Sequence, residues 1–167
     1  RDWSSDVCSS DLALANDLVS GQKISEPDLV VIATPTSALE SSINRFQDMY
    51  PQSTFIDIGS TKTKVQVEVQ KYPDLAKRFC PTHPMAGREL DGAEAAQSDL
   101  FEGKSWIITP LVSTSESSIA LTRKLIESLG ARVIEMTVAD HDAAVATISH
   151  LPQVISSLLD RKSTRLN

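Results

Sequence analysis

Residues 28–35, Asp-Leu-Val-Val-Ile-Ala-Thr-Pro, decide the fold class that we expect for this chain. A continuous aliphatic and β-branched run of this kind is typical of a strand that is buried on both faces of a parallel sheet. Parallel strands need long crossover connections, which are usually helices. The run therefore predicts a sheet that is covered by helices.

Four further runs along the chain have a similar apolar character: residues 54–59, 78–83, 105–110 and 131–136. Helical patterns and short connections lie between most of them. This alternation predicts an α/β fold with a doubly wound, mostly parallel sheet.

Two of the connecting helices have clear end signals. One begins at Ser37, which forms a capping box with Glu40, and ends at Pro51. The other ends at Gly130, a residue suited to a left-handed helix cap. Their apolar faces are expected to comprise Leu39, Ile43 and Phe46 in the first helix, and Ile119, Leu125, Ile126 and Leu129 in the second.

Residues 60–71 allow two interpretations, because their valines alternate as in a strand. We expect a helix, since a crossover between parallel strands needs one and Val65 and Val69 stack at positions i and i+4. Ser60 or Thr61 is expected to cap it. After Thr137 the sequence is rich in helix formers, and residues 139–159 are predicted to begin a second, helical domain that is kinked near Pro152.

The composition excludes several functional classes. The chain has 167 residues, of which 41% are hydrophobic, and its formal charge of −6 argues against a nucleic-acid or membrane partner. Two cysteines cannot form a disulfide framework, so a cytoplasmic location is expected. No paired-cysteine or His-Glu-x-x-His spacing occurs, and no metal site is predicted.

Both ends of the chain look foreign to the fold. Residues 1–12 and 160–167 resemble translations of sequencing-library adapter DNA, and we expect them to be artefacts. The remaining residues are then a piece of a longer protein, with 13–138 forming a partial α/β domain.

Polar side chains follow three of the predicted strands. They are Thr34, Ser60 and His83, the last held in extended backbone by the prolines of the stretch 81–89, Pro-Thr-His-Pro-Met-Ala-Gly-Arg-Glu. Ligands of open α/β sheets bind beyond the carboxyl ends of the strands. The three side chains are therefore expected to share one crevice.

Several segments together resemble the prephenate/arogenate dehydrogenase family of tyrosine biosynthesis. They are ATPT (33–36), DIGSTKTK (57–64), HPMAGRE (83–89), DGAE (91–94), DLFEGKSW (99–106) and ADHDAAVATISHLPQ (139–153). The similarity runs from about Asp28 to Leu158, and the HPMAGRE variant suggests a bacterial prephenate dehydrogenase. It implies an incomplete Rossmann-like domain followed by the first helix of a truncated all-α domain for substrate binding and dimerisation.

The resemblance implies the oxidative decarboxylation of prephenate to 4-hydroxyphenylpyruvate with NAD or NADP; arogenate is the alternative substrate. In this family's chemistry, His83 accepts the proton of the substrate hydroxyl group, which suits an imidazole with an ordinary pKa of about 6.5. Ser60 is similar to the hydroxyl that orients His83 and the nicotinamide, with a plain helix cap as its structural alternative.

Other residues gain expected roles from the same resemblance. Thr34 and Pro35 resemble the segment under the ribose and nicotinamide of the cofactor. Glu89 and His150 look like walls of the substrate pocket, with a helix cap and a position before the kink as their structural alternatives. His141 is expected to be an N-terminal helix residue, not a ligand.

The family's glycine loop is expected upstream of residue 13, and most of the helical domain beyond residue 159. The parent protein is expected to be a homodimer, and the isolated chain to be inactive. A noncatalytic Rossmann-like regulatory module is the alternative of a different class. Another small-acid dehydrogenase of the same plan is disfavoured, because such enzymes are expected to lack the HPMAG segment.

Overall fold

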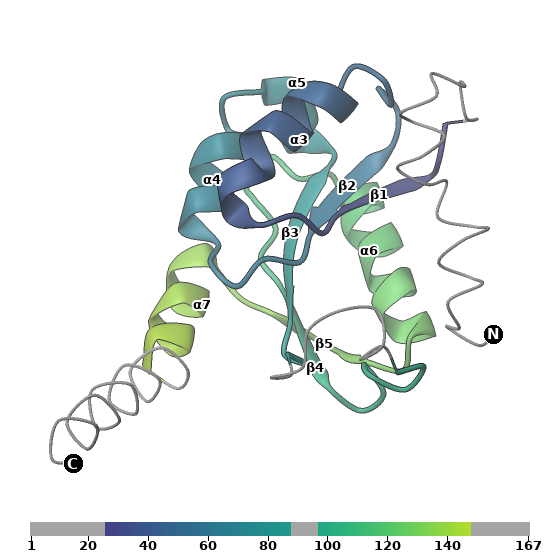
Figure 1. Cartoon of the computed structure of the whole chain (residues 1–167), viewed down its shortest axis with the longest axis vertical. Coiled ribbons are helices and arrows are strands. Elements are labelled where there is room, and N and C mark those ends of the chain that lie inside the picture. The colour runs from purple at the N-terminus through teal and green to yellow at the C-terminus, as the bar shows by residue number, and fades with distance from the viewer. Residues whose placement is uncertain (1–25, 88–96, 148–167) are drawn as a thin grey trace, which may run out of the picture.

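The computed structural model describes residues 26–87 and 97–147, which form one five-stranded sheet with helices on both faces (Figure 1). The sheet order follows the chain: β1 (Leu29–Ile32), β2 (Thr54–Asp57), β3 (Phe79–Pro84), β4 (Ser105–Ile108) and β5 (Arg132–Glu135). All five predicted strands are present, and the predicted Rossmann-like α/β class is confirmed.

The strands do not all run in one direction. β1, β2 and β3 are mutually parallel, whereas β4 is antiparallel to β3, and β5 is parallel to β4. β2 pairs with residues 79–81 of β3, and β4 pairs with residues 82–84. The second half of β3 therefore extends past the end of β2 and carries the last two strands.

The helices form two layers. One contains η1 (Thr36–Ala38), α3 (Leu39–Phe46), α4 (Thr63–Val69) and α5 (Pro73–Lys77); the other contains α6 (Glu116–Ser128). Figure 1 shows these layers on opposite sides of the strands. Phe55 and Phe79 pack into the core under the first layer, while Ile56 and Cys80 pack with Ile126 of α6. β2 and β3 are thus buried on both faces, as alternating side chains of a covered sheet must be.

β1 differs from its prediction, because Val31 is 42% exposed and the strand is not buried on both faces. It pairs only with β2 among the described residues, so its other edge has no strand partner there. An apolar run alone cannot distinguish a central strand from one at the border of a sheet.

The helix predicted after β1 exists, but its start was predicted wrongly. A short 3-10 turn, Thr36–Ala38, precedes α3, and Ala38 occupies the N-cap position without a side-chain hydrogen bond. The capping box of Ser37 and Glu40 therefore does not form. The predicted apolar face is correct, since Leu39 and Ile43 are buried and Phe46 packs against the same cluster.

Residues 63–69 form a helix, which decides between the two interpretations of this segment. Val65 and Val69 are fully buried, whereas Val67 is 57% exposed. The cap was predicted wrongly: Lys62 is the N-cap residue, and no side chain of the segment caps the helix. The short α5, which begins with Pro73, was not predicted.

α6 begins at the cap Ser115, whose side chain accepts a hydrogen bond from the backbone N–H of Ser118. It ends as predicted at Gly130, which has φ +73. The N–H groups of Gly130 and Ala131 donate to the carbonyls of Glu127 and Ile126, the bond pattern of a Schellman cap.

α7 (Val138–Val145) follows β5 and packs against α4. Its cap is Thr137, which accepts a hydrogen bond from the N–H of Asp140. Within residues 26–87 and 97–147, no helix combines the length and the apolar character needed to cross a membrane. The predicted artefact ends and the predicted kink near Pro152 lie outside the described residues.

Candidate active site at the carboxyl edge of the sheet

The three parallel strands end together. Their last shared row consists of Ile32, Asp57 and Pro81. The residues predicted to share one crevice, Thr34, Ser60 and His83, follow this row by only two or three positions. The structure therefore puts all three at one edge of the sheet.

Two of these residues lie at the surface. Thr34 and Ser60 are exposed, as is the neighbouring Pro35, and Thr34 Oγ1 lies 3.2 Å from Ser42 Oγ on α3. Ser60 occupies the turn between β2 and α4 and does not cap that helix. Their exposed positions are compatible with the predicted cofactor-binding roles, which remain proposals.

The turn after β2 is closely packed at Gly59. Its N–H donates to Asp57 Oδ2 over 2.9 Å. A Cβ atom at this position would lie 3.1 Å from that same oxygen and 3.5 Å from Thr36 Cγ2. The absence of a side chain lets the loops after β1 and β2 approach each other closely at the edge of the sheet.

A buried cation joins the ends of β2 and β3. Lys62 is fully buried, and its Nζ atom donates both to Asp57 Oδ2 and to the carbonyl oxygen of Thr82. Thr82 in turn donates its hydroxyl to the Asp57 carbonyl over 2.6 Å. Burial raises the pKa of the Asp57 carboxyl group against the opposing effect of Lys62. Burial lowers the pKa of Lys62 against the attraction of Asp57.

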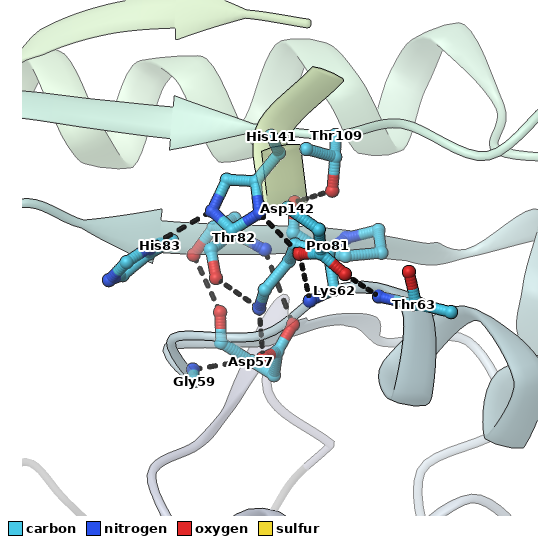
Figure 2. Close-up of polar contacts among 10 residues, drawn as sticks. All are labelled: Asp57, Gly59, Lys62, Thr63, Pro81, Thr82, His83, Thr109, His141 and Asp142. Carbon is cyan, nitrogen blue, oxygen red and sulfur yellow. Dashed lines mark hydrogen bonds and ion pairs between the residues drawn. The ribbon is translucent and has the colours of Figure 1, made fainter. Parts of the chain in front are cut away.

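His83 directly follows Thr82 and contacts a second histidine. Its Nδ1 atom lies 2.9 Å from Nε2 of His141, and the two rings meet edge to face with their centroids 5.1 Å apart. His83 is half-buried, whereas His141 is fully buried in the first turn of α7. Figure 2 shows His83 and His141 pointing toward each other from β3 and α7.

Asp142 extends this chain of contacts to α4. Its Oδ1 atom lies 2.7 Å from Nδ1 of His141 and accepts the N–H of Lys62 over 2.9 Å. Its Oδ2 atom accepts the N–H of Thr63 over 2.8 Å. Asp142 therefore caps α4 from another helix, which is why neither Ser60 nor Thr61 performs this function (Figure 2).

The Asp142 carboxyl group is strongly favoured in its ionised form over its protonated form. Burial raises its pKa, but hydrogen bonds from Thr63, Lys62 and His141 outweigh that effect and hold the pKa well below the ordinary value. A carboxylate that accepts several N–H groups is expected to remain ionised throughout the neutral range.

Two residues of this site were not predicted from the sequence. His141 is in an N-terminal helical turn as expected, yet it also contacts His83 from 58 residues away. Lys62 lies in the segment GSTK but received no role. The signals available were the Asp-His-Asp spacing and a lysine directly after a predicted strand end. Glu89 and His150 lie outside the described residues, and their roles stay predictions.

The described residues contain no cluster of three His, Cys, Asp or Glu side chains that could hold a metal ion. Their fold and site have the features of a nucleotide-binding α/β domain: parallel strands ending at one edge, with small and polar residues following β1 and β2 and an imidazole at the end of β3. These features define the class of protein as a nucleotide-binding α/β protein.

Comparison with known sequences identifies the family. The family described as "Prephenate dehydrogenase, nucleotide-binding domain" matches residues 2–135. The chain therefore belongs to the prephenate dehydrogenase family. It is similar to the prephenate dehydrogenase of Bacillus subtilis (strain 168), with 30% identity over 150 residues, which are 87% of this chain and 39% of that protein.

Solved structures give the same result. The prephenate dehydrogenase of Aquifex aeolicus, in complex with hydroxyphenyl propionate and NAD+, has a TM-score of 0.80 and 26% identity, and the match covers 95% of this chain and 55% of that one. The arogenate dehydrogenase of Synechocystis has a TM-score of 0.68 and 31% identity, covering 81% and 48% respectively. The chain thus spans about half the length of these structures.

Proposed function

We propose that this chain is the cofactor-binding part of an NAD- or NADP-dependent prephenate dehydrogenase. Its activity would be the oxidative decarboxylation of prephenate to 4-hydroxyphenylpyruvate in tyrosine biosynthesis. The observation that carries the proposal is the position of His83, at the end of a parallel strand and level with the turn that contains Gly59 and Ser60. Arogenate is the alternative substrate, since a relative of known structure is an arogenate dehydrogenase.

The described residues fit the nicotinamide end of such a cofactor. Thr34, Pro35 and Ser60 form an exposed edge with two hydroxyl groups, and Gly59 lets the loops behind it pack closely, so a flat ring could lie across the strand ends. The glycine loop expected to hold the pyrophosphate is outside the described residues, so the choice between NAD and NADP stays open.

The chemistry assigned to the chain is proton transfer and orientation. A bound nicotinamide would accept the hydride from the ring carbon that carries the hydroxyl group. His83 would accept the hydroxyl proton on its imidazole as the oxygen becomes a carbonyl. The ring carboxylate then leaves as carbon dioxide, and its bonding electrons make the ring aromatic. Ser60 would orient His83 and the nicotinamide.

The decisive experiment uses a chain extended to the length of its relatives by recovering the flanking reading frame. His83→Asn is expected to lower kcat for prephenate-dependent NADH or NADPH formation by about 10²–10⁴, the usual contribution of a general base. Ser60→Ala is expected to lower kcat as well, and the exposed Ser128→Ala on α6 provides the matched control. A noncatalytic regulatory module would form no reduced cofactor in any of these variants.

The chain alone is expected to behave differently from its extended form. Because it covers only part of its relatives, we propose that it binds cofactor poorly and has no measurable turnover. We also propose a cytoplasmic location and a homodimeric parent protein without nucleic-acid or membrane partners. Prephenate-dependent NADH formation by the chain of 167 residues would contradict the first of these statements.

A further inference from the structure

The contact between His83 and His141 restricts which of their imidazole nitrogens can be protonated. It is one step in a chain of contacts that runs from His83 Nδ1 through both nitrogens of His141 to Asp142 Oδ1. A neutral imidazole has one N–H donor and one acceptor nitrogen, so the roles of adjacent rings in such a chain depend on each other. The proton positions along these contacts can therefore be assigned one after another, starting from the charged Asp142.

Asp142 fixes the first step. Its two oxygens already accept the backbone N–H groups of Lys62 and Thr63, and an ionised carboxylate can only accept hydrogen bonds. The 2.7 Å contact to His141 therefore needs a proton on Nδ1 of His141. A carboxylate in this position selects one tautomer of a histidine and fixes the orientation of its ring.

The second step follows for a neutral His141. With its proton on Nδ1, the Nε2 atom of His141 carries a lone pair and can only accept. The 2.9 Å contact then needs a proton on Nδ1 of His83, which leaves the lone pair of that ring on its Nε2 atom. A protonated His141 would donate from both nitrogens and would select the opposite tautomer of His83.

We propose that His141 and Asp142 are positioning residues that hold His83 in its Nδ1–H tautomer, so that Nε2 is the atom that accepts the substrate proton. The catalytic part of this inference rests on the proposed function. In the proton transfer, the substrate O–H bond breaks and an N–H bond forms at Nε2. His83 becomes an imidazolium whose Nδ1–H still donates to His141, and the negative charge of Asp142 stabilises it.

The fold fixes the relay formed by His83, His141 and Asp142 on both sides of His141. Asp142 is bound to the N-terminal N–H groups of α4, and the first turn of α7 is closed by the cap of Thr137. His141 is fully buried between them, so its ring cannot leave the contact without opening the packing. These constraints fix the direction of the hydrogen bond that reaches His83.

The tautomer can be measured in the chain as it exists. We would label its three histidines with ¹⁵N and assign the imidazole nitrogens by NMR at a pH of about 8.5, where free imidazoles are neutral. The expected result is a protonated Nδ1 and an unprotonated Nε2 in His83. A protonated Nε2 in the unsubstituted chain would overturn the proposal without any variant being needed.

Two variants of His141 test the relay itself. His141→Leu removes the acceptor, and the ratio of the His83 tautomers is expected to move about fivefold toward Nε2–H, the effect of losing one hydrogen bond. His141→Gln can accept from His83 and donate to Asp142 through one amide, so it is expected to restore the original ratio. Equal ratios in the two folded variants would refute the relay.

Asp142→Asn and Asp140→Asn form a second pair around His141. An amide cannot accept from all three groups that now donate to Asp142, so the Nδ1–H population of His83 is expected to fall. Asp140 bonds Thr137, not His141, and its variant is expected to leave the tautomers unchanged. Unchanged tautomers in Asp142→Asn would contradict its role.

The extended chain connects the tautomer to the reaction. His141→Leu is expected to lower kcat by about the factor by which the Nδ1–H population falls, with KM unchanged and with rescue by His141→Gln. If the extended chain forms no reduced cofactor although the tautomer is as expected, the proposed function and the proton-accepting role fail together. If the tautomer is wrong in an active enzyme, only the relay fails.

Discussion

Asp57 and Lys62 form an ion pair whose side chains are 4% and 0% exposed, at the point where β2 leads into α4. The ammonium group also donates to the carbonyl oxygen of Thr82, directly before His83. The pair therefore ties the ends of β2 and β3 to each other at the candidate site. A charged group buried so completely is tolerated only with such partners.

Replacement of Lys62 is expected to be severely destabilising. Lys62→Met leaves the Asp57 carboxyl group buried without its partner, which typically costs about 3–5 kcal/mol in the free energy of unfolding. Denaturant unfolding followed by circular dichroism measures this change. The exposed Lys64→Met makes the same chemical change on α4 and is expected to cost less than about 0.5 kcal/mol. An equal loss in the free energy of unfolding in both variants would show that the buried ion pair contributes no more stability than an exposed lysine.

The low pKa of Asp142 predicts sensitivity to acid. Its pKa in the folded chain lies below its value of about 3.9 in the unfolded chain. The resulting stabilisation is complete above that unfolded value and is lost as the pH falls toward the folded one. The free energy of unfolding is therefore expected to decrease below a pH of about 4, and less steeply in Asp142→Asn.

Chemical denaturation at a series of pH values measures this dependence. Asp140→Asn, on the same helix, is the control and is expected to keep the slope of the unsubstituted chain. The same slope in Asp142→Asn would mean that another group causes the acid sensitivity.

Cys80 is expected to be unreactive in the folded protein. Burial on β3 raises the pKa of its thiol to about 11, so very little thiolate exists at neutral pH. In a Cys8→Ser chain, where Cys80 is the only thiol, alkylation by iodoacetamide at a pH of about 8 is expected to proceed at the rate of unfolding. Labelling as fast as that of a free thiol would contradict this burial.

Gly130 is expected to resist substitution. Its φ of +73 closes α6, and a Cβ atom there would lie 3.4 Å from Glu102 Cγ. Gly130→Ala is expected to cost about 1–2 kcal/mol, the penalty of a left-handed backbone for a residue with a side chain. Thermal unfolding provides the measurement. Gly87→Ala is the control, because Gly87 has no positive φ and no atom of the described residues lies within 4 Å of the added Cβ.

Local patterns predicted those elements that local physics determines. The apolar run of β2 and the spacing of Val65 and Val69 specify burial directly, and both are fully confirmed. Gly130 was predictable for the same reason, since a helix end in the left-handed region favours a residue without a side chain. The same kind of apolar run located all five strands, although it does not specify their order in the sheet.

Contacts between distant residues could not be predicted in this way. A buried run such as Trp106 to Ile108 has the same composition in a parallel or an antiparallel strand, so the reversal of β4 left no local signal. The N-terminus of α4 offered Ser60 and Thr61 as caps, but Asp142 satisfies its N–H groups from 80 residues away. The meeting of His83 and His141 depends on the same packing of α7 against α4.

The reversed direction of β4 and β5 has a practical consequence for how the protein can be divided. β5 ends at Glu135, which pairs with Ile108 of β4, and Ile108 pairs in turn with Thr82 of β3. The chain therefore leaves the sheet close to His83, the residue after Thr82. A truncation at Thr137 would appear to spare every strand, yet it would delete His141 and Asp142. Any shortened chain that is meant to keep the contacts of His83 must therefore retain α7 through Asp142.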